Sequence, residues 1–554
     1  MTPIILRPDQ AALKQGVYNE WNAGAQNVLA VLPTGGGKSI VTTDIVLDGH
    51  NQGMTEVVMA HRNELVSQMS LHVARRGIKH RIIGSASTIA GIVQEHRAEF
   101  GRSFVNPDAK CSVGSVQTIV SRADTLRQWA AQVDRFTGDE GHHFLRDNMW
   151  GKAANLFTNA RGLLVTACPQ RADGKGLGRH ADGIVDAMVV GQTMRQLIDQ
   201  TPPALSDYEF GIPRSDNPLE MDDGDVTEGG DFSPKKMRKA SDKSQIVGDV
   251  VKEYQARAMG RRAICFAIDV KDSTDIANRF NEAGIPAASV SAKTDVGVRR
   301  DMIRRFREGR ILVLVNVDLF DEGFDVPACD VVIMARPTAS LNKYLQMAGR
   351  AMRIDPANPN KVALIIDHVS NFKRHRMPDR PRAWTLDRRD KRAKQAPDPD
   401  DIPLTACREC SRPYERVLPR CPYCGAEPPL PAPGSRTPER VDGDLMLLDR
   451  ETLAQLRAAM TLEAPGDVGD RVTHVAGAIA GKGAANRAIE RHTAQADLRA
   501  AIEQWAGIRR HMGEDDRVTH RRFYHATGMT VLHALALPRQ EMEAMRATVE
   551  GWYR

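Results

Sequence analysis

The residues with the clearest chemical potential form a glycine-rich segment, Pro33-Thr34-Gly35-Gly36-Gly37-Lys38-Ser39. It lies between an apolar run, 28–32, and a helical pattern that begins near Lys38. Glycines let backbone N–H groups approach an anion, and a helix N-terminus adds its positive dipole end. Lys38 can then reach the terminal phosphates of a nucleotide, and Ser39 can ligate Mg²⁺. A flexible turn is the alternative, but a turn does not require Gly-Lys-Ser at this junction.

An acidic pair stands in Asp139-Glu140-Gly141-His142-His143. Asp139 is suited to hold Mg²⁺ through water, and Glu140 to orient or deprotonate an attacking water. The preceding residues, 135–138, are less apolar than those of an ideal buried strand. An acidic helix cap followed by surface histidines is therefore the alternative interpretation.

Four of the eight cysteines are bunched as two Cys-x-x-Cys pairs separated by ten residues. Each pair can form a tight knuckle, and together they predict one structural, tetrahedral Zn²⁺ site in a zinc ribbon. Two disulfides are the alternative. Arginines interleave with the ligands, where they would contact a phosphate backbone or a partner, or remain solvated surface charge. The four expected ligands are Cys407, Cys410, Cys421 and Cys424.

Two blocks of alternating apolar runs and amphipathic stretches predict two α/β lobes with parallel sheets. The segment 216–231 carries seven acidic residues and no Lys or Arg, and 371–394 carries ten Lys or Arg against three Asp. The last hundred residues show helical periodicity and few strand signals. We expect lobe 1 at 1–205, an acidic flexible connection at 206–242, lobe 2 at 243–370, a basic linker at 371–403, the zinc ribbon at 404–427, a Pro-rich linker at 428–443 and an all-α domain at 444–554.

Composition and sequence pattern argue against a disordered, a secreted and a membrane-spanning protein. Hydrophobic residues make up 42% and charged residues 26%, near the globular average, and the net charge is only +6. The N-terminus lacks a secretory pattern, and no run of 18 apolar residues occurs. We therefore expect a cytoplasmic protein with no membrane partner.

The motifs in their order resemble those of the superfamily-two helicases, and within them the group that includes the DNA-repair helicase RadD and phage-encoded helicases. The resemblance covers roughly 5–424, and it implies two RecA-like lobes with ATP and Mg²⁺ between them. In lobe 1, Arg7 and Gln10 resemble the adenine-contacting element, and 60–65 resembles motif Ia. The segment 166–169 resembles motif III, although Cys168 replaces the usual threonine.

In lobe 2, 316–325 resembles motif V and 346–353 resembles motif VI. By this resemblance Arg350 and Arg353 are arginine fingers beside the catalytic Gln346, and Gly323 and Asp325 belong to the nucleotide site. A surface ion-pair role is the alternative for the two arginines. The resemblance also places Arg62, Gln117 and Thr118 of lobe 1 near the nucleic-acid backbone.

The family resemblance implies an ATP-dependent DNA helicase or translocase that acts in repair, recombination or replication. Three alternatives stay open: the motor subunit of a restriction or defence complex, an RNA helicase, and an ATP-gated clamp that does not unwind. The C-terminal aromatics Trp505, Phe523, Tyr524 and Trp552 follow helical spacing and are expected to form a core, with base stacking as the alternative. A protein partner could bind through the ribbon or this domain.

Overall fold

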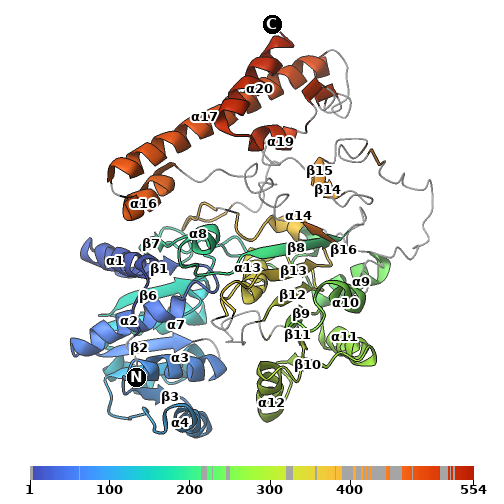
Figure 1. Ribbon diagram of the computed structural model, residues 1–554. Coiled ribbons are helices and arrows are strands. Elements are labelled where there is room, and N and C mark those ends of the chain that lie inside the picture. The colour runs from blue at the N-terminus through green and yellow to red at the C-terminus, as the bar shows by residue number, and fades with distance from the viewer. Residues whose placement is uncertain are drawn as a thin grey trace.

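The structure is a computed structural model of the 554-residue chain. It describes residues 4–60, 63–213, 221, 223–227, 229–244, 250–317, 319, 329–355, 358–380, 382–389, 404–406, 413–415, 420, 425–426, 445–448, 465–476, 478–511, 519, 522–523, 526–527, 529 and 531–553. Two α/β lobes lie side by side, and a helical arm lies above them in the view of Figure 1.

Lobe 1 is built on a seven-stranded parallel sheet with the order β3-β4-β2-β5-β6-β1-β7. Its central strands are buried on both faces, as expected for a sheet covered by crossover helices. The strands are β1 (Asn27–Val31), β2 (Glu56–Ala60), β3 (Arg81–Ile83), β4 (Cys111–Ser115), β5 (Arg135–Gly138), β6 (Arg161–Thr166) and β7 (Ala187–Val190). The helices are α1 (Pro8–Asn22), α2 (Lys38–Asn51), α3 (Asn63–Arg75), α4 (Ala86–Phe100), α5 (Val116–Ser121), α6 (Ala123–Ala130), α7 (Met149–Asn155) and α8 (Met194–Asp199).

Lobe 2 has a second seven-stranded sheet with the order β10-β11-β9-β12-β13-β8-β16, parallel except for β16. The two α/β lobes expected from the sequence are therefore confirmed. The strands are β8 (Tyr208–Pro213), β9 (Ala263–Phe266), β10 (Ala287–Ser291), β11 (Val313–Val317), β12 (Val331–Met334), β13 (Ala363–Asp367) and β16 (Leu445–Leu448). The helices are α9 (Pro234–Ser244), α10 (Val250–Arg257), α11 (Val270–Glu282), α12 (Val296–Arg307), α13 (Leu341–Ala351) and α14 (Asn371–His375).

Two expected linkers contain ordered elements of the lobes. The range 206–242 includes β8, which pairs with β13 and buries Tyr208 and Phe210 in the core, so it is not wholly a connection. Residues 371–389 form α14 and a segment packed on lobe 1, because Trp384 and Leu386 cover its apolar core. The antiparallel partner of β8 is β16, which comes from the range 444–554 that we expected to be all helical.

Arg135 explains why β5 is less apolar than its neighbours. Its Nη1 donates to the Ile45 carbonyl oxygen at 2.7 Å, and its guanidinium lies 5.3 Å from the Trp21 ring centroid. Glu56 on the adjacent β2 lies 3.5 Å away. A charged residue can therefore occupy a central strand, since its donors have partners inside the fold.

The C-terminal helices are α16 (Pro465–Ala476), α17 (Ala478–His511), α19 (Val531–Ala536) and α20 (Arg539–Gly551). The expected aromatic core is present, because Trp505 is 6% exposed and Phe523 1% exposed and their rings pack with that of Trp552. Tyr524 lies outside the described residues. Among the helices that the structure describes, none combines the length and apolar character that crossing a membrane requires.

Part of the expected zinc ribbon is described. Strands β14 (Leu404–Ala406) and β15 (Pro413–Glu415) pair antiparallel, with Leu404 opposite Glu415. The four cysteines expected to bind Zn²⁺ lie outside the described residues. The rest of the described chain contains no group of three or more His, Cys, Asp or Glu side chains that could hold a metal ion.

A buried network in lobe 1 has an ordered set of hydrogen bonds. Phe104 N donates to His96 Nδ1 at 3.2 Å, so His96 carries its proton on Nε2 and donates it to Ser70 Oγ at 3.0 Å. The Ser70 hydroxyl then donates to His80 Nε2 at 2.6 Å, and His80 Nδ1 donates to the Ile78 carbonyl oxygen at 2.9 Å. Burial lowers the pKa of His80 to about 4 and lowers the pKa of His96. Both imidazoles are therefore neutral in the folded lobe.

This network predicts an acid-sensitive lobe 1. An unfolded histidine has a pKa near 6.5, so below that pH the unfolded chain binds more protons than the folded one. The free energy of local opening at α3 and α4 should fall as the pH drops from 6.5 to 4, with His80 contributing about 3 kcal/mol of this loss. Hydrogen exchange across this pH range measures it. In His80→Gln, which cannot titrate, the pH dependence should be weaker; an unchanged dependence would contradict the assignment.

Candidate active site

The glycine-rich loop follows β1 and leads into α2 at Lys38. Gly35 (φ 84°) and Gly37 (φ 97°) adopt left-handed conformations that L side chains rarely reach. The first N–H groups of α2 have no intrahelical acceptor and point out of its N-terminus. Lys38 Nζ lies 3.4 Å from the Leu32 carbonyl oxygen, so the side chain folds back over the loop. Thr34 Oγ1 is buried with no hydrogen-bond partner. The loop therefore fits a phosphate, which would give these donors an acceptor.

The N-terminal end of α1 fixes the outer side of this loop. Arg7 Nη2 and Gln10 Nε2 donate to the Gly36 carbonyl oxygen at 2.6 and 3.2 Å. A Cβ on Gly37 would lie 2.2 Å from Gln10 Nε2, so α1 leaves no room for a side chain there. In this structure both residues hold the loop, and the adenine contact implied by the family resemblance would be an additional role.

The acidic pair lies at the carboxyl end of β5. Glu140 is 4% exposed and has a left-handed backbone (φ 50°), which is unusual for a residue with a side chain. Burial lowers the pKa of Lys38, and the carboxylates of Glu140 and Asp139 act in the opposite direction because they lie close to its ammonium group. The Glu140 side chain makes no helix-cap hydrogen bond, and His142 is buried, so the alternative of a cap followed by surface histidines does not describe this segment.

Helix α13 of lobe 2 brings the expected second set of side chains to the same place. Gln346 Nε2 donates to Glu140 Oε1 at 3.2 Å. Arg350 is 3% exposed, so it is not a surface ion-pair residue. Arg350 and Arg353 follow Gln346 at and just beyond the C-terminal end of α13, and their positive charges favour a lower pKa for Lys38. The acidic pair, the glycine-rich loop and this end of α13 therefore meet at the interface between the two lobes, which we call the seam.

The loop and α13 are in direct contact. A Cβ on Gly349 would lie 2.7 Å from Thr34 Cβ, and a Cβ on Gly35 would lie 3.5 Å from Arg353 Cγ and 2.7 Å from Leu205 Cδ2. Apolar side chains of both lobes form one continuous core cluster around this contact, including Leu197 and Met347. The structure thus shows the lobes closed on each other at the glycine-rich loop.

His142 links the acidic pair to both lobes, a role that the sequence analysis did not predict. Asn342 Nδ2 of α13 lies 3.0 Å from His142 Nε2, and Thr166 Oγ1 lies 3.1 Å from His142 Nδ1. The Thr166 hydroxyl donates to the Cys168 carbonyl oxygen, so the histidine proton is on Nδ1 and Asn342 donates to Nε2. Arg171 Nη1 donates to the His142 carbonyl oxygen at 2.7 Å. The only sequence signal was the position of His142 two residues after Glu140.

The remaining predicted residues do not all lie at the glycine-rich loop. Gln117 and Thr118 begin α5 after β4, away from the glycine-rich loop, and Ser115 Oγ accepts from Thr118 N at 3.1 Å. Ser39 is in the first turn of α2. The predicted residues outside the described part of the chain are Arg62, Gly323 and Asp325.

Two family profiles match the chain. The profile of the res subunit of type III restriction enzymes matches residues 3–171, which is most of lobe 1. The profile of the helicase conserved C-terminal domain matches residues 242–355, which lie in lobe 2. The first range contains the glycine-rich loop and Glu140, and the second contains α13, so together they include both sides of the interface between the lobes.

Known proteins extend this likeness over most of the chain. A 51.5 kDa protein of Lactococcus phage (isolate 7-9) is 31% identical over 426 residues, which cover 76% of this chain and 82% of that protein. The IRC3 protein of Saccharomyces cerevisiae, whose name assigns it provisionally as an ATP-dependent helicase, is 24% identical over 63% of this chain; the match spans 50% of the yeast protein. The DNA 3'-5' translocase XPB2 of Sulfurisphaera tokodaii is 30% identical over 128 residues, 23% of this chain and 26% of that protein. The chain belongs to the superfamily-two helicases, a family of ATP-dependent motors that act on nucleic acid.

Proposed function

We propose that this chain is a DNA-dependent ATPase that moves along or unwinds DNA, in repair, recombination or replication. The observation that carries the proposal is the contact of α13 of lobe 2 with the glycine-rich loop and with Glu140 of lobe 1, where Gln346 donates to Glu140 and Gly349 lies against Thr34. The choice of DNA is supported by the likeness to XPB2, which is named a DNA translocase, and by the resemblance to the RadD group. The likeness to a type III restriction subunit favours a second candidate, the motor of a restriction or defence complex.

In lobe 1 the proposed roles follow from position. The amides of the glycine-rich loop and Lys38 bind the β- and γ-phosphates, and Thr34 gains an acceptor for its buried hydroxyl. Mg²⁺ held by Ser39 and, through water, by Asp139 would offset the charge of the phosphates. Glu140 is placed to orient and deprotonate the attacking water, with Gln346 holding its carboxylate.

In lobe 2, Arg350 and Arg353 stabilise the negative charge that develops during transfer of the phosphoryl group. They reach the site only when α13 lies against the loop, so hydrolysis depends on closure of the lobes. Loss of the γ-phosphate removes contacts to both lobes and favours opening. Alternating closure and opening would move the lobes relative to each other along a nucleic-acid strand.

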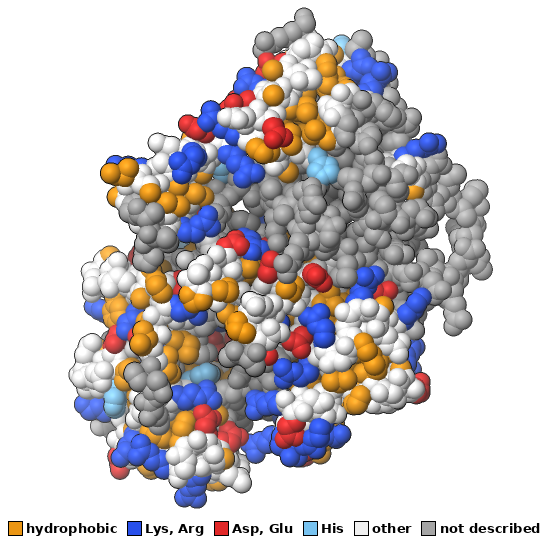
Figure 2. All heavy atoms as spheres, in the orientation of Figure 1, with side chains coloured by type: hydrophobic (Ala, Val, Ile, Leu, Met, Phe, Trp, Pro, Cys, Tyr) orange, Lys and Arg blue, Asp and Glu red, His pale blue; other side chains and the backbone are white. Residues whose placement is uncertain are grey.

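The proposed strand-binding surface lies at the other end of the seam. Gln117 and Thr118 follow β4, which is separated from β1 by β2, β5 and β6. Lys and Arg side chains occur on both lobes at the lower end of the molecule, where α4 and α12 lie (Figure 2). Arg300 of α12 forms an ion pair with Glu95 of α4 at 2.6 Å, so the lobes also touch there. Basic side chains on both sides of a seam suit a phosphate backbone.

The zinc ribbon is part of the same proposal. The cysteine spacing supports it, and so does the β14–β15 pair, since the first two expected ligands fall between these strands. Four thiolates would leave no open coordination position, so the metal would be structural. The ribbon or the C-terminal helices would then be available to a protein partner.

The function is tested by ATP hydrolysis measured with single-stranded DNA, duplex DNA, forked DNA and RNA. We expect DNA to stimulate turnover and RNA to stimulate it weakly. Lys38→Ala should abolish the stimulated turnover because the loop loses its phosphate-binding cation, and it should leave the chain folded, as judged by circular dichroism. Strand-displacement and translocation assays on the same substrates separate a motor from a clamp.

The matched control is Lys152→Ala, which removes an exposed lysine from α7 in the same lobe. It should hydrolyse ATP as the unaltered chain does. Stimulation by RNA alone would overturn the choice of DNA, and turnover retained in Lys38→Ala would overturn the site. Movement that occurs only with an added nuclease partner would favour the restriction candidate.

Zinc content is a separate expectation. Elemental analysis of protein purified in reducing buffer should give about one Zn²⁺ per chain, as expected of four thiolate ligands. Replacing Cys407 and Cys410 by serine should remove it, whereas replacing the buried Cys111 should not. Purified protein that contains no zinc would contradict the zinc ribbon, and it would not bear on the proposed ATP site.

A further inference from the structure

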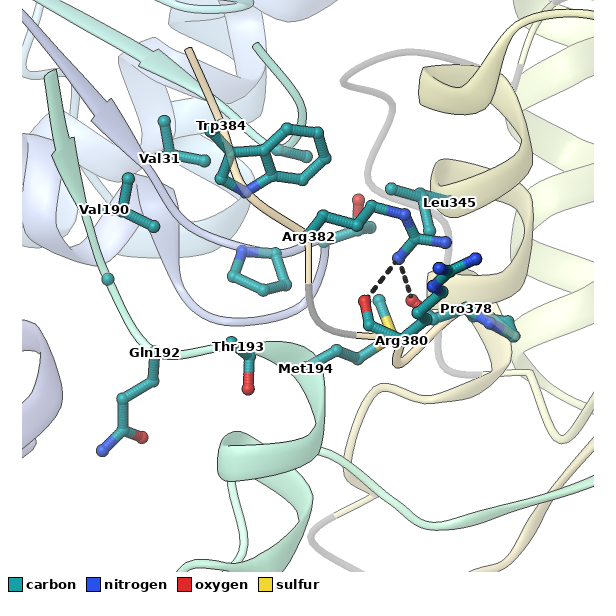
Figure 3. A pocket seen from close by; sticks show the side chains of 14 residues that line it. Val31, Val190, Gln192, Thr193, Met194, Leu345, Pro378, Arg380, Arg382 and Trp384 are labelled. Atoms are coloured by element: carbon teal, nitrogen blue, oxygen red, sulfur yellow. Dashed lines mark hydrogen bonds between the residues drawn. The ribbon is translucent and has the colours of Figure 1, made fainter. Parts of the chain in front are cut away.

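The segment after α14 crosses from lobe 2 back to lobe 1; we call residues 376–380 and 382–389 the strap. Its first turn is fixed by Arg382, whose guanidinium donates to the carbonyl oxygens of Pro378 and Arg380 at 3.0 and 2.8 Å (Figure 3). It also donates to the carbonyl oxygens of His375 and Met377, each at 3.1 Å. Trp384 then packs against the core cluster that the two lobes share and against a second cluster within lobe 1. The strap therefore seats in the junction between the lobes.

A cavity of about 60 Å³ marks this junction. Its walls come from Val31 and Val190 of lobe 1, from Leu345 of lobe 2, and from Arg380 and Trp384 of the strap (Figure 3). Thr34 of the glycine-rich loop also lines it. The strap and the glycine-rich loop thus line the same cavity, although the strap is not part of the loop.

The strap ends on the loop that follows motif III. Arg389 N donates to the Gly174 carbonyl oxygen at 2.9 Å, and Gly178 N donates to the Leu386 carbonyl oxygen at 3.0 Å. Arg388 pairs with Asp182. A Cβ on Gly176 would lie 2.7 Å from the Arg388 backbone nitrogen, so the two backbones are in close contact. The strap and this loop are fitted to each other along their main chains.

One strap side chain reaches Arg171, two residues after motif III. Arg389 Nη2 donates to the Arg171 carbonyl oxygen at 2.8 Å, and the Arg171 guanidinium donates to the His142 carbonyl oxygen at 2.7 Å. Burial raises the pKa of Cys168 to about 12, and the positive charges of Arg382 and Arg389 oppose this rise. A chain of contacts therefore runs from the strap through Arg171 to His142, two residues from Glu140.

We propose that Arg389 is a positioning residue of the ATPase: docked through the strap, it holds Arg171 and the His142 backbone so that Glu140 and α13 meet in the hydrolytic geometry. The proposal rests on the proposed function. No strap residue needs to touch the nucleotide.

The test compares two variants that disturb this docking in different ways. Arg389→Ala removes the hydrogen bond to Arg171, and Gly176→Ala pushes the strap backbone away without altering any side chain of the seam. Each should lower kcat for nucleic-acid-stimulated ATP hydrolysis about fivefold, the scale of one lost hydrogen bond. The KM for ATP should stay near that of the unaltered chain in both variants. The melting temperature should stay near it in Arg389→Ala and fall in Gly176→Ala, whose added methyl group meets backbone atoms. Arg389→Lys should restore part of kcat, since lysine can still donate to Arg171.

Matched controls are available for both. Arg388→Ala makes the same charge change one residue earlier but removes only an exposed ion pair, so its effect should stay below about twofold. Gly91→Ala adds a methyl group on α4 where no atom lies within 4 Å. Unaltered kcat in both test variants, or an equal loss in Arg388→Ala, would overturn the positioning role. A chain with no ATPase activity at all would instead overturn the proposed function.

Discussion

The contact between the glycine-rich loop and α13 is the constraint on which the rest of the structure depends. Gly349 has no side chain because Thr34 occupies that space, and Gly35 lies against Leu205 and the Arg353 stem. Because these residues are small, the glycine-rich loop of lobe 1 and α13 of lobe 2 can pack in direct contact. Only in that contact can a lysine from one lobe and guanidiniums from the other act on the same phosphate.

In the proposed function, electrostatics at the seam would couple closure of the lobes to nucleotide. The charges of Glu140 and Asp139 favour the protonated form of Lys38, and those of Arg353 and Arg350 oppose it. A bound triphosphate would add negative charge among these cations and favour closure, and loss of the γ-phosphate would weaken it. The interlobe hydrogen bonds of Gln346 to Glu140 and of Asn342 to His142 would then carry the change between the lobes.

The two lobes and the glycine-rich loop could be predicted from local sequence patterns, because alternating apolar runs and a Gly-Lys-Ser junction have strong signatures. Gln346, Arg350 and Arg353 were assigned to the site only through the family resemblance. The sequence was not sufficient to predict where the lobes end and the linkers begin. Residues 208–213 lie in the range expected to be a connection, yet they form a strand paired with β13 on one side and β16 on the other. The strap looked like a basic linker, although its arginines donate to carbonyl groups. His142 and Asn342 carry no local pattern for their pairing, since they are 200 residues apart. Contacts of that kind arise from tertiary structure alone.

The central claim is that groups from both lobes act on one triphosphate, and Arg350→Ala tests it most directly. Single-turnover hydrolysis in the presence of stimulating nucleic acid should slow by roughly 10³-fold, as for loss of an arginine finger, while binding of a nonhydrolysable ATP analogue and folding persist. Arg350→Lys should remain strongly impaired because lysine cannot reproduce the planar guanidinium. A folded Arg350→Ala chain that turns over ATP at the unaltered rate would contradict the account.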